Sequence, residues 1–213
     1  MFIELVDTLR CPKPHEESWL VLSARTLEAR HVRDGTLGCP VCLAEYPIRD
    51  GVADFRSAEG GGGGEQGTPS VVASIEADYL AAMMDLSDPK GFAVLVGAWC
   101  ARATDLLESS DAPPLILVDP PVGVEMQPGL SGVRCDGELP LAAAAARAVA
   151  VDTSDAARVR SAARATRVGG RVVAPADAPL PDGVRELARD ERVWVGAREV
   201  LPSAPIALHV RRG

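Results

Sequence analysis

The sequence predicts an α/β protein in which a small zinc-ribbon β module precedes a Rossmann-like, mostly parallel sheet with an antiparallel C-terminal strand pair. Three observations predict this fold class. Cysteines at metal-ligand spacing lie near the start, a glycine tract follows them, and the remaining sequence alternates short apolar runs with helix-like segments. We therefore divide the chain into a zinc-ribbon domain (1–55), a Gly-rich linker (56–70) and a Rossmann-like domain (71–213).

The first module carries a C-P-V-C knuckle, in which Cys39 and Cys42 can reach one tetrahedral ion. Cys11 opens the other half-site in LRCPKPHEE, where Pro14 stands at the position of the expected second cysteine and His15 is the nearest replacement. Imidazole is a normal partner of three thiolates, and the spacing of the half-sites suits a ribbon with a hairpin between them. We therefore predict a structural zinc ion bound by Cys11, His15, Cys39 and Cys42, with no open position for water.

Two alternatives to this ligand set stay open. In the first, the site has decayed, so that Cys39 and Cys42 are small buried hydrophobic residues and His15 lies on the surface. In the second, His31 replaces His15 as a ligand. His31 lies in ARTLEARHVRD, which has the alternation of a strand, and a solvated strand face is the simpler interpretation of it.

The linker sequence RSAEGGGGGEQGTPS marks the boundary between the two domains, because a glycine tract does not repay the entropy of ordering it. After it, VVASIEADYLAAMMDL places apolar residues at helical spacing. We expect one amphipathic helix over 71–86, with Ser70 as its N-cap and Asp88-Pro89 as its stop.

Continuous apolar runs then predict strands that are buried on both faces of a parallel sheet. These runs cover residues 92–96, 115–119, 147–152 and 171–175. Helix-like segments over 99–110 and 153–170 are expected to connect them as crossovers. The final residues, 191–200 and 202–213, predict two strands joined by a short turn, and hence an antiparallel pair at the edge of the sheet.

Composition excludes several classes of protein. The formal net charge of -8 argues against broad binding of nucleic acid, which needs clustered Lys and Arg. The sequence has no apolar run long enough to cross a bilayer and no signal-peptide pattern at its start. Five cysteines, two of them in a knuckle, fit metal binding in a reducing compartment, so we expect a cytoplasmic protein. Cys100 and Cys135 are expected to be inert thiols.

The metal-ligand motifs also carry a resemblance to a family. LRCPKPH, followed by GTLGCPVCLAEYPIRDGVADF, closely resembles the small zinc-ribbon proteins that bind and activate RNA and protein methyltransferases. The stretch from Tyr46 to Val52 matches their hallmark, an aromatic residue followed by Pro-Ile-x-Asp-Gly and a hydrophobic residue. The departure is the missing cysteine of the first half-site. The resemblance implies a module that docks on a methyltransferase partner by extending the partner's sheet.

The second domain is similar to class I S-adenosylmethionine methyltransferases in the order of its predicted elements. In that family the first strand ends in a glycine-rich turn that lets the backbone approach the cofactor. The resemblance implies that Gly97, Asp119 and Asp136 are the cofactor-binding residues here. The other two glycine positions carry Trp99 and Ala101, and we expect the indole to occupy space that S-adenosylmethionine needs.

The residues themselves leave a simpler interpretation open for the acidic side chains. Asp119 and Asp136 can be ordinary acids in turns at strand ends. No catalytic tetrad follows Val151, and Asp152 is expected to act at most as a capping residue with Thr153 and Ser154. Support for S-adenosylmethionine as a cofactor is therefore thin.

The contrast between a well-kept ribbon and a poorly kept cofactor loop predicts a non-catalytic scaffold or regulatory subunit. It would combine an activator-like zinc ribbon with a degenerate methyltransferase-like domain and act on another protein, such as a methyltransferase or a larger complex. The alternative is an active S-adenosylmethionine-dependent methyltransferase that carries its activator in cis. A third hypothesis, a module that binds another small ligand at the carboxyl ends of the strands, rests on fold analogy alone.

Overall fold

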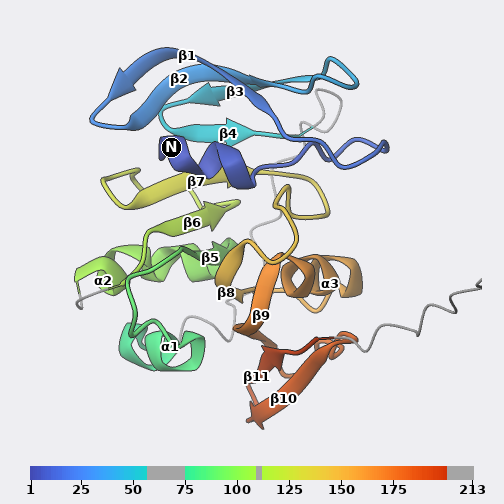
Figure 1. Ribbon diagram of the computed structural model, residues 1–213. Coiled ribbons are helices and arrows are strands. Elements are labelled where there is room, and N and C mark those ends of the chain that lie inside the picture. Colours follow the sequence, from blue (N-terminus) through green and yellow to red (C-terminus); the bar gives the residue numbers. More distant parts are fainter. Residues whose placement is uncertain (57–74, 109–111, 201–213) are drawn as a thin grey trace, which may run out of the picture.

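The computed structural model describes residues 1–56, 75–108 and 112–200. Within these residues the protein is a mixed α/β structure built on one 11-stranded sheet with the strand order β1-β2-β3-β4-β7-β6-β5-β8-β9-β11-β10 (Figure 1). The strands are β1 (Val21–Glu28), β2 (His31–Gly38), β3 (Glu45–Arg49), β4 (Val52–Asp54), β5 (Ala93–Val96), β6 (Leu115–Val118), β7 (Leu130–Arg134), β8 (Ala146–Ala150), β9 (Thr166–Pro175), β10 (Val184–Arg189) and β11 (Val193–Arg198).

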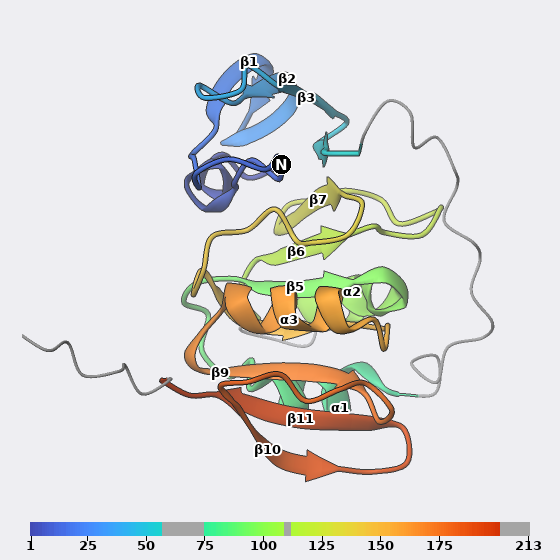
Figure 2. The ribbon, with the colours of Figure 1, turned by 90° about the vertical axis from the view of Figure 1, so that its right-hand side faces the viewer.

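Helices cover both faces of the part of the sheet that lies beyond β4. The helices are η1 (Ile3–Thr8) and η3 (Gly97–Arg102), both of the 3-10 type, and α1 (Ala77–Met84), α2 (Ala103–Glu108) and α3 (Ala156–Ala165). Figure 2 shows α3 on one face, with α1 and α2 behind the sheet. The described chain therefore has three layers in this region.

The first 56 residues form an antiparallel sheet of four strands. The hairpin of β1 and β2 lies between Cys11 and Cys39, which confirms the hairpin predicted between the two half-sites. β3 pairs with β2, and β4 returns along β3 through the turn at Asp50 and Gly51. Gly51 has φ +79°, a backbone conformation that glycine adopts without strain.

The strands β7, β6, β5, β8 and β9 are parallel to one another. Side chains of each strand alternate between the two faces: Val94 and Val96 of β5 pack on the α3 side, whereas Ala93 and Leu95 pack against α1, η3 and α2. Strands buried on both faces explain the continuous apolar runs. The strands predicted over 92–96, 115–119, 147–152 and 171–175 are confirmed as β5, β6, β8 and the second half of β9.

One sheet runs across the predicted boundary between the ribbon and the larger part. β4 pairs with β7 in parallel, with Val52 opposite Gly132 and Asp54 opposite Arg134, and the Phe55 amide donates to the Arg134 carbonyl oxygen over 2.8 Å. The hydrophobic core is also shared, because ribbon residues and α3 residues belong to one buried cluster. The division into domains stays a prediction, and residues 57–70 of the predicted linker lie outside the described residues.

A second connection joins the segment before Cys11 to the segment that precedes β8. The Arg10 amide donates to the Pro140 carbonyl oxygen over 2.9 Å, and the Ala142 amide donates to the Thr8 carbonyl oxygen over 2.8 Å. The first metal half-site is therefore attached directly to the larger part of the sheet.

The structure corrects several predicted elements. The helix expected over 71–86 begins only at Ala77 and ends at Met84, because Asp85 adopts the left-handed conformation; Ser70 lies outside the described residues. The crossover expected over 99–110 is η3 followed by α2, and the one expected over 153–170 is the shorter α3, whose N-cap is Asp155 rather than Asp152. The Asp155 carboxylate accepts the Arg158 amide over 2.7 Å.

The antiparallel pair at the C-terminal edge is present, but its partners differ from the prediction. The strand expected over 191–200 is β11, which pairs with β10 and β9, both antiparallel to it. No sequence pattern predicted β10, and the second predicted strand, 202–213, lies outside the described residues. No helix in the described part of the chain is both long enough and apolar enough to span a lipid bilayer.

Candidate metal centre and crevice

The four predicted metal ligands lie together in the ribbon. The ligand atoms of Cys11, His15, Cys39 and Cys42 all fall within 4.8 Å of one another. The Cys11 and Cys42 sulfurs are 3.7 Å apart, and His15 Nε2 lies 3.2 Å from the Cys11 sulfur and 3.4 Å from that of Cys39. The alternative of a decayed site put His15 on the surface, whereas here the residue is half-buried and its ring lies beside the thiols.

Three of these ligand separations can be compared with those around a tetrahedral ion. Zinc with sulfur at about 2.3 Å and nitrogen at about 2.0 Å requires S···S separations of about 3.8 Å and S···N separations of about 3.5 Å. The measured separations of 3.7, 3.2 and 3.4 Å approach these edge lengths. The cluster can therefore hold a metal ion and is compatible with zinc.

The hydrogen bond of His15 selects the ring nitrogen that faces the thiols. His15 Nδ1 lies 2.6 Å from the Glu16 carbonyl oxygen, which can only accept, so Nδ1 carries the proton and Nε2 presents its lone pair to the sulfurs. Histidine ligands commonly donate their second nitrogen in this way. His31 is not part of the cluster: it lies at the start of β2, with its ring against Phe2.

The knuckle of Cys39 and Cys42 favours a thiolate. Cys39 is buried, which opposes ionisation, but the backbone amides of Cys42 and Val41 and the neighbouring thiols together lower the pKa of Cys39 to about 6. Burial raises the pKa of Cys11 above its usual value. Thiolates are the form that binds a metal ion. Cys39 of the knuckle therefore forms a thiolate more readily than Cys11 does.

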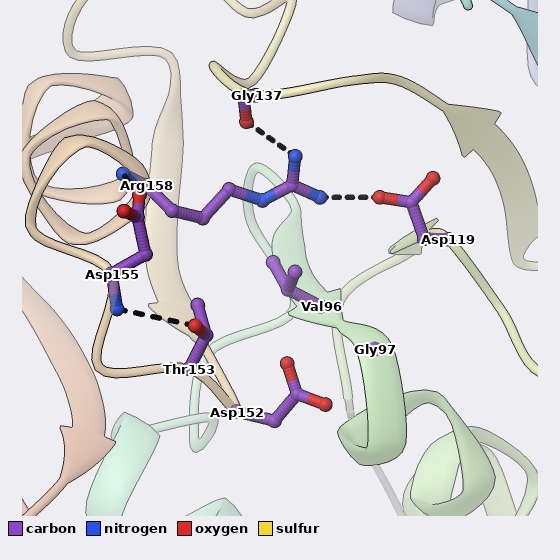
Figure 3. A pocket seen from close by; sticks show the side chains of 8 residues that line it. All are labelled: Val96, Gly97, Asp119, Gly137, Asp152, Thr153, Asp155 and Arg158. Atoms are coloured by element: carbon purple, nitrogen blue, oxygen red, sulfur yellow. Dashed lines mark hydrogen bonds and ion pairs between the residues drawn. The ribbon is translucent and has the colours of Figure 1, made fainter. Parts of the chain in front are cut away.

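A second candidate site is a crevice of about 370 Å³ at the carboxyl ends of the parallel strands. It lies where the strand order reverses, because β5 is followed along the chain by β6 on one side and is paired with β8 on the other. Ligands of open α/β sheets bind at such a point. The crevice is lined by Val96, Gly97, Asp119, Gly137, Asp152, Thr153, Asp155 and Arg158 (Figure 3).

The turn after β5 is closed by an acidic side chain of the same protein. The Asp152 carboxylate accepts the Ala98 amide over 2.7 Å at the start of η3. Gly97 has φ +61°, and a Cβ at this position would lie 2.2 Å from Asp152 Oδ2. Asp152 therefore lies where the backbone would approach a ligand. The sequence predicted at most a capping role for Asp152, whereas in the structure its carboxylate binds the Ala98 amide and Asp155 caps α3.

Arg158 extends from α3 across the crevice (Figure 3). Its guanidinium forms an ion pair with Asp119 and donates to the Gly137 carbonyl oxygen. The second carboxylate oxygen of Asp119 accepts the Cys135 amide over 2.9 Å. Both oxygens of Asp119 are thus bound within the protein, and the side chain of Arg158 connects α3 to the ends of β6 and β7.

The structure brings only part of the predicted cofactor set together. Gly97 and Asp119 line the crevice, whereas Asp136 is exposed and is absent from the lining, to which its neighbour Gly137 belongs. The prediction that the Trp99 indole occupies the crevice is wrong. It is fully buried in the core on the side of α1 and α2, where its Nε1 donates to the Val151 carbonyl oxygen over 3.0 Å.

Three further side chains line this crevice without having been predicted there: Asp152, Asp155 and Arg158. Asp152 is the last residue of a predicted strand, so the rule that ligands bind at carboxyl ends of parallel strands was a usable signal for it. Arg158 carried no such signal, because its position depends on where α3 begins and how it packs. Cys100 and Cys135 are buried, and burial raises the pKa of both thiols, to about 12 for Cys135.

No protein-family model matches the chain, and a search of curated proteins gives no significant match.

Proposed function

We propose that the protein is a non-catalytic scaffold or regulatory subunit in which a structural zinc ribbon is joined to a methyltransferase-like domain that no longer binds S-adenosylmethionine. The observation that carries this proposal is the internal use of the crevice. The acids at the ends of β6 and β8, Asp119 and Asp152, bind Arg158 and two backbone amides of the same chain.

The zinc part of the proposal rests on the donor set and its geometry. Three thiolates and one imidazole form a closed tetrahedral site, in which zinc stabilises the fold and leaves no position for a reacting water. Cys11 and His15 lie in one segment and Cys39 and Cys42 in another that is distant in the sequence, so an ion at this point would cross-link the knuckle to the segment that precedes β1.

The order of strands supports a methyltransferase-like ancestry. From β7 to β10 the order is β7-β6-β5-β8-β9-β11-β10, with β11 antiparallel to its neighbours, which agrees with the element order that the sequence shares with class I methyltransferases. The resemblance of the ribbon adds a second argument. Its YPIRDGV segment ends in β4, the strand that extends the larger sheet.

The docking of β4 on β7 has a consequence for partners. The family that the ribbon resembles docks on a separate methyltransferase by extending its sheet, and here β4 pairs within its own chain. A partner protein would therefore contact other surfaces, and the ribbon and the larger part would present them as one body. Five free cysteines and a thiolate metal site support a reducing, cytoplasmic location.

Isothermal titration of S-adenosylmethionine into the zinc-loaded full chain tests the proposal. We expect no binding with a dissociation constant below about 1 mM. A micromolar dissociation constant that is weakened in Asp119→Asn and kept in Asp105→Asn, a change of an exposed acid on α2, would overturn it. The variant Asp136→Asn adds a further comparison, because the family resemblance and the crevice geometry assign that residue differently.

A second candidate function is favoured by the position of the crevice itself. It has the volume of a ligand site, lies at the reversal of the strand order, and begins with a glycine of positive φ. An active methyltransferase with its activator in cis would use Gly97 and Asp119 there. This function requires S-adenosylmethionine-dependent methyl transfer that disappears in Asp119→Ala, and the same binding titration separates it from the first proposal.

A further inference from the structure

The Tyr46 side chain connects the metal cluster to the core of the ribbon. Tyr46 is 4% exposed, and its ring packs on Phe55 with the ring centroids 4.6 Å apart. Its hydroxyl lies 3.1 Å from the Cys11 sulfur. Packing alone would be served equally well by phenylalanine, because burying a hydroxyl costs free energy unless it is hydrogen-bonded.

Cys11 is the ligand whose sulfur lies within hydrogen-bond distance of the Tyr46 hydroxyl. The Cys39 sulfur is held by the amides of its own knuckle, those of Val41 and Cys42. The Cys11 segment has only the Lys13 amide in the corresponding role, since Pro12 and Pro14 flank it and have no N–H. The Tyr46 hydroxyl is placed to supply a second donor to this sulfur.

We propose that Tyr46 is a positioning residue of the metal centre, whose hydroxyl donates a hydrogen bond to the Cys11 thiolate and holds that ligand in the orientation the metal needs. This inference rests on the zinc site proposed above. Once Cys11 is bound to a metal ion its sulfur can only accept, so the hydroxyl must be the donor. Outer partners of this kind orient ligands, and their loss commonly weakens metal binding 10- to 100-fold.

The sequence offers a matched pair of variants, because Tyr46 and Tyr79 are its two tyrosines. Tyr46→Phe removes the hydroxyl and keeps the ring on Phe55. Tyr79→Phe makes the same chemical change on α1, where the residue is 49% exposed and far from the ligands in sequence and fold. Phe55→Leu is a third variant, which alters the packing of the ring and keeps the hydroxyl.

The experiment measures zinc affinity by competition with a chelator, and the spectrum of the cobalt-substituted protein. In Tyr46→Phe we expect a zinc dissociation constant about 10-fold higher and a shifted thiolate-to-cobalt charge-transfer band. Tyr79→Phe and Phe55→Leu should keep the wild-type band, since the band reports the electrons on sulfur and not general stability. An unshifted band in Tyr46→Phe would overturn the inference, whatever the affinity.

A measurement on the wild-type chain covers the case in which Tyr46→Phe does not fold. In protein loaded with cadmium-113, a hydroxyl proton bonded to the Cys11 sulfur should show scalar coupling to the metal, and its absence from the spectrum would reject the hydrogen bond. The zinc site fails separately: a wild-type chain that binds neither zinc nor cobalt at one ion per chain would refute the site, and with it this inference.

Discussion

Val52 on β4 lies directly against Gly132 on β7, and a Cβ atom at position 132 would come within 2.6 Å of Val52 Cγ2. The absence of a side chain at position 132 allows the ribbon strand to approach the edge of the larger sheet. The Gly132 amide also donates to the Gly51 carbonyl oxygen over 3.3 Å. This close approach is the contact through which the two parts of the chain share one sheet.

We predict that Gly132→Ala lowers the free energy of unfolding by about 2 kcal/mol, because the β-branched side chain of Val52 cannot move away without shifting the strand. Urea denaturation measures the change. Gly38→Ala is the matched control, since its added Cβ would have the Val21 carbonyl oxygen at 3.9 Å as its nearest neighbour. In the double variant Gly132→Ala/Val52→Ala the losses should be less than additive; strictly additive losses would contradict this contact.

Removing the metal should destabilise the whole described structure and not the ribbon alone. The segment before Cys11 is hydrogen-bonded to Pro140 and Ala142, and Phe55 contacts both Tyr46 and Arg134. We expect a strong chelator to lower the Tm by about 10 °C, the effect of losing a ligand present at about 1,000 times its dissociation constant. Amide hydrogen exchange at Phe55 should become faster.

Cysteine variants provide the controls for metal removal. Cys39→Ser should have a low Tm that a chelator no longer changes, because one ligand is already lost. Cys135→Ser should respond to the chelator as the wild type does, since Cys135 lies beside Arg158 at the crevice. A wild-type Tm that is insensitive to chelation would argue against a structural metal ion.

Trp99 is expected to act on stability and not on access to the crevice. Its indole fills the core between the sheet and α1, so Trp99→Ala should cost about 4 kcal/mol of unfolding free energy. Trp19→Ala, at a site that is 64% exposed, should cost far less. Calorimetric titration of Trp99→Ala with S-adenosylmethionine should give no binding; micromolar binding by this variant would restore the view that the indole blocks a cofactor.

Much of the candidate metal centre was predictable from local sequence. The C-P-V-C knuckle fixes the geometry of Cys39 and Cys42 within four residues, and the pair pattern directs attention to Cys11. His15 could be named as a replacement because it lies close to Cys11. The hydrogen bond from Tyr46 could not be predicted, because it depends on the tertiary packing that brings β3 against the segment of Cys11, 35 positions earlier in the chain.

The crevice was predictable only where a residue directly follows a strand. Gly97 and Asp119 could be found in this way, since apolar runs reveal where parallel strands end. Trp99 was misinterpreted because η3 turns the chain after Gly97, so that residue 99 points into the opposite core. The position of a side chain relative to a sheet face is set by the turn, and a spacing motif does not report it.

The sequence by itself determined an α/β protein with a C-P-V-C ribbon motif at its start and buried parallel strands after a glycine tract, because these features follow from local spacing and hydrophobic periodicity. Only the tertiary structure decided that β4 joins β7, that Arg158 closes the crevice onto Asp119, and that Tyr46 reaches Cys11. The physical reason is that each of these contacts joins segments far apart in the chain, and its free energy depends on packing that no local pattern encodes.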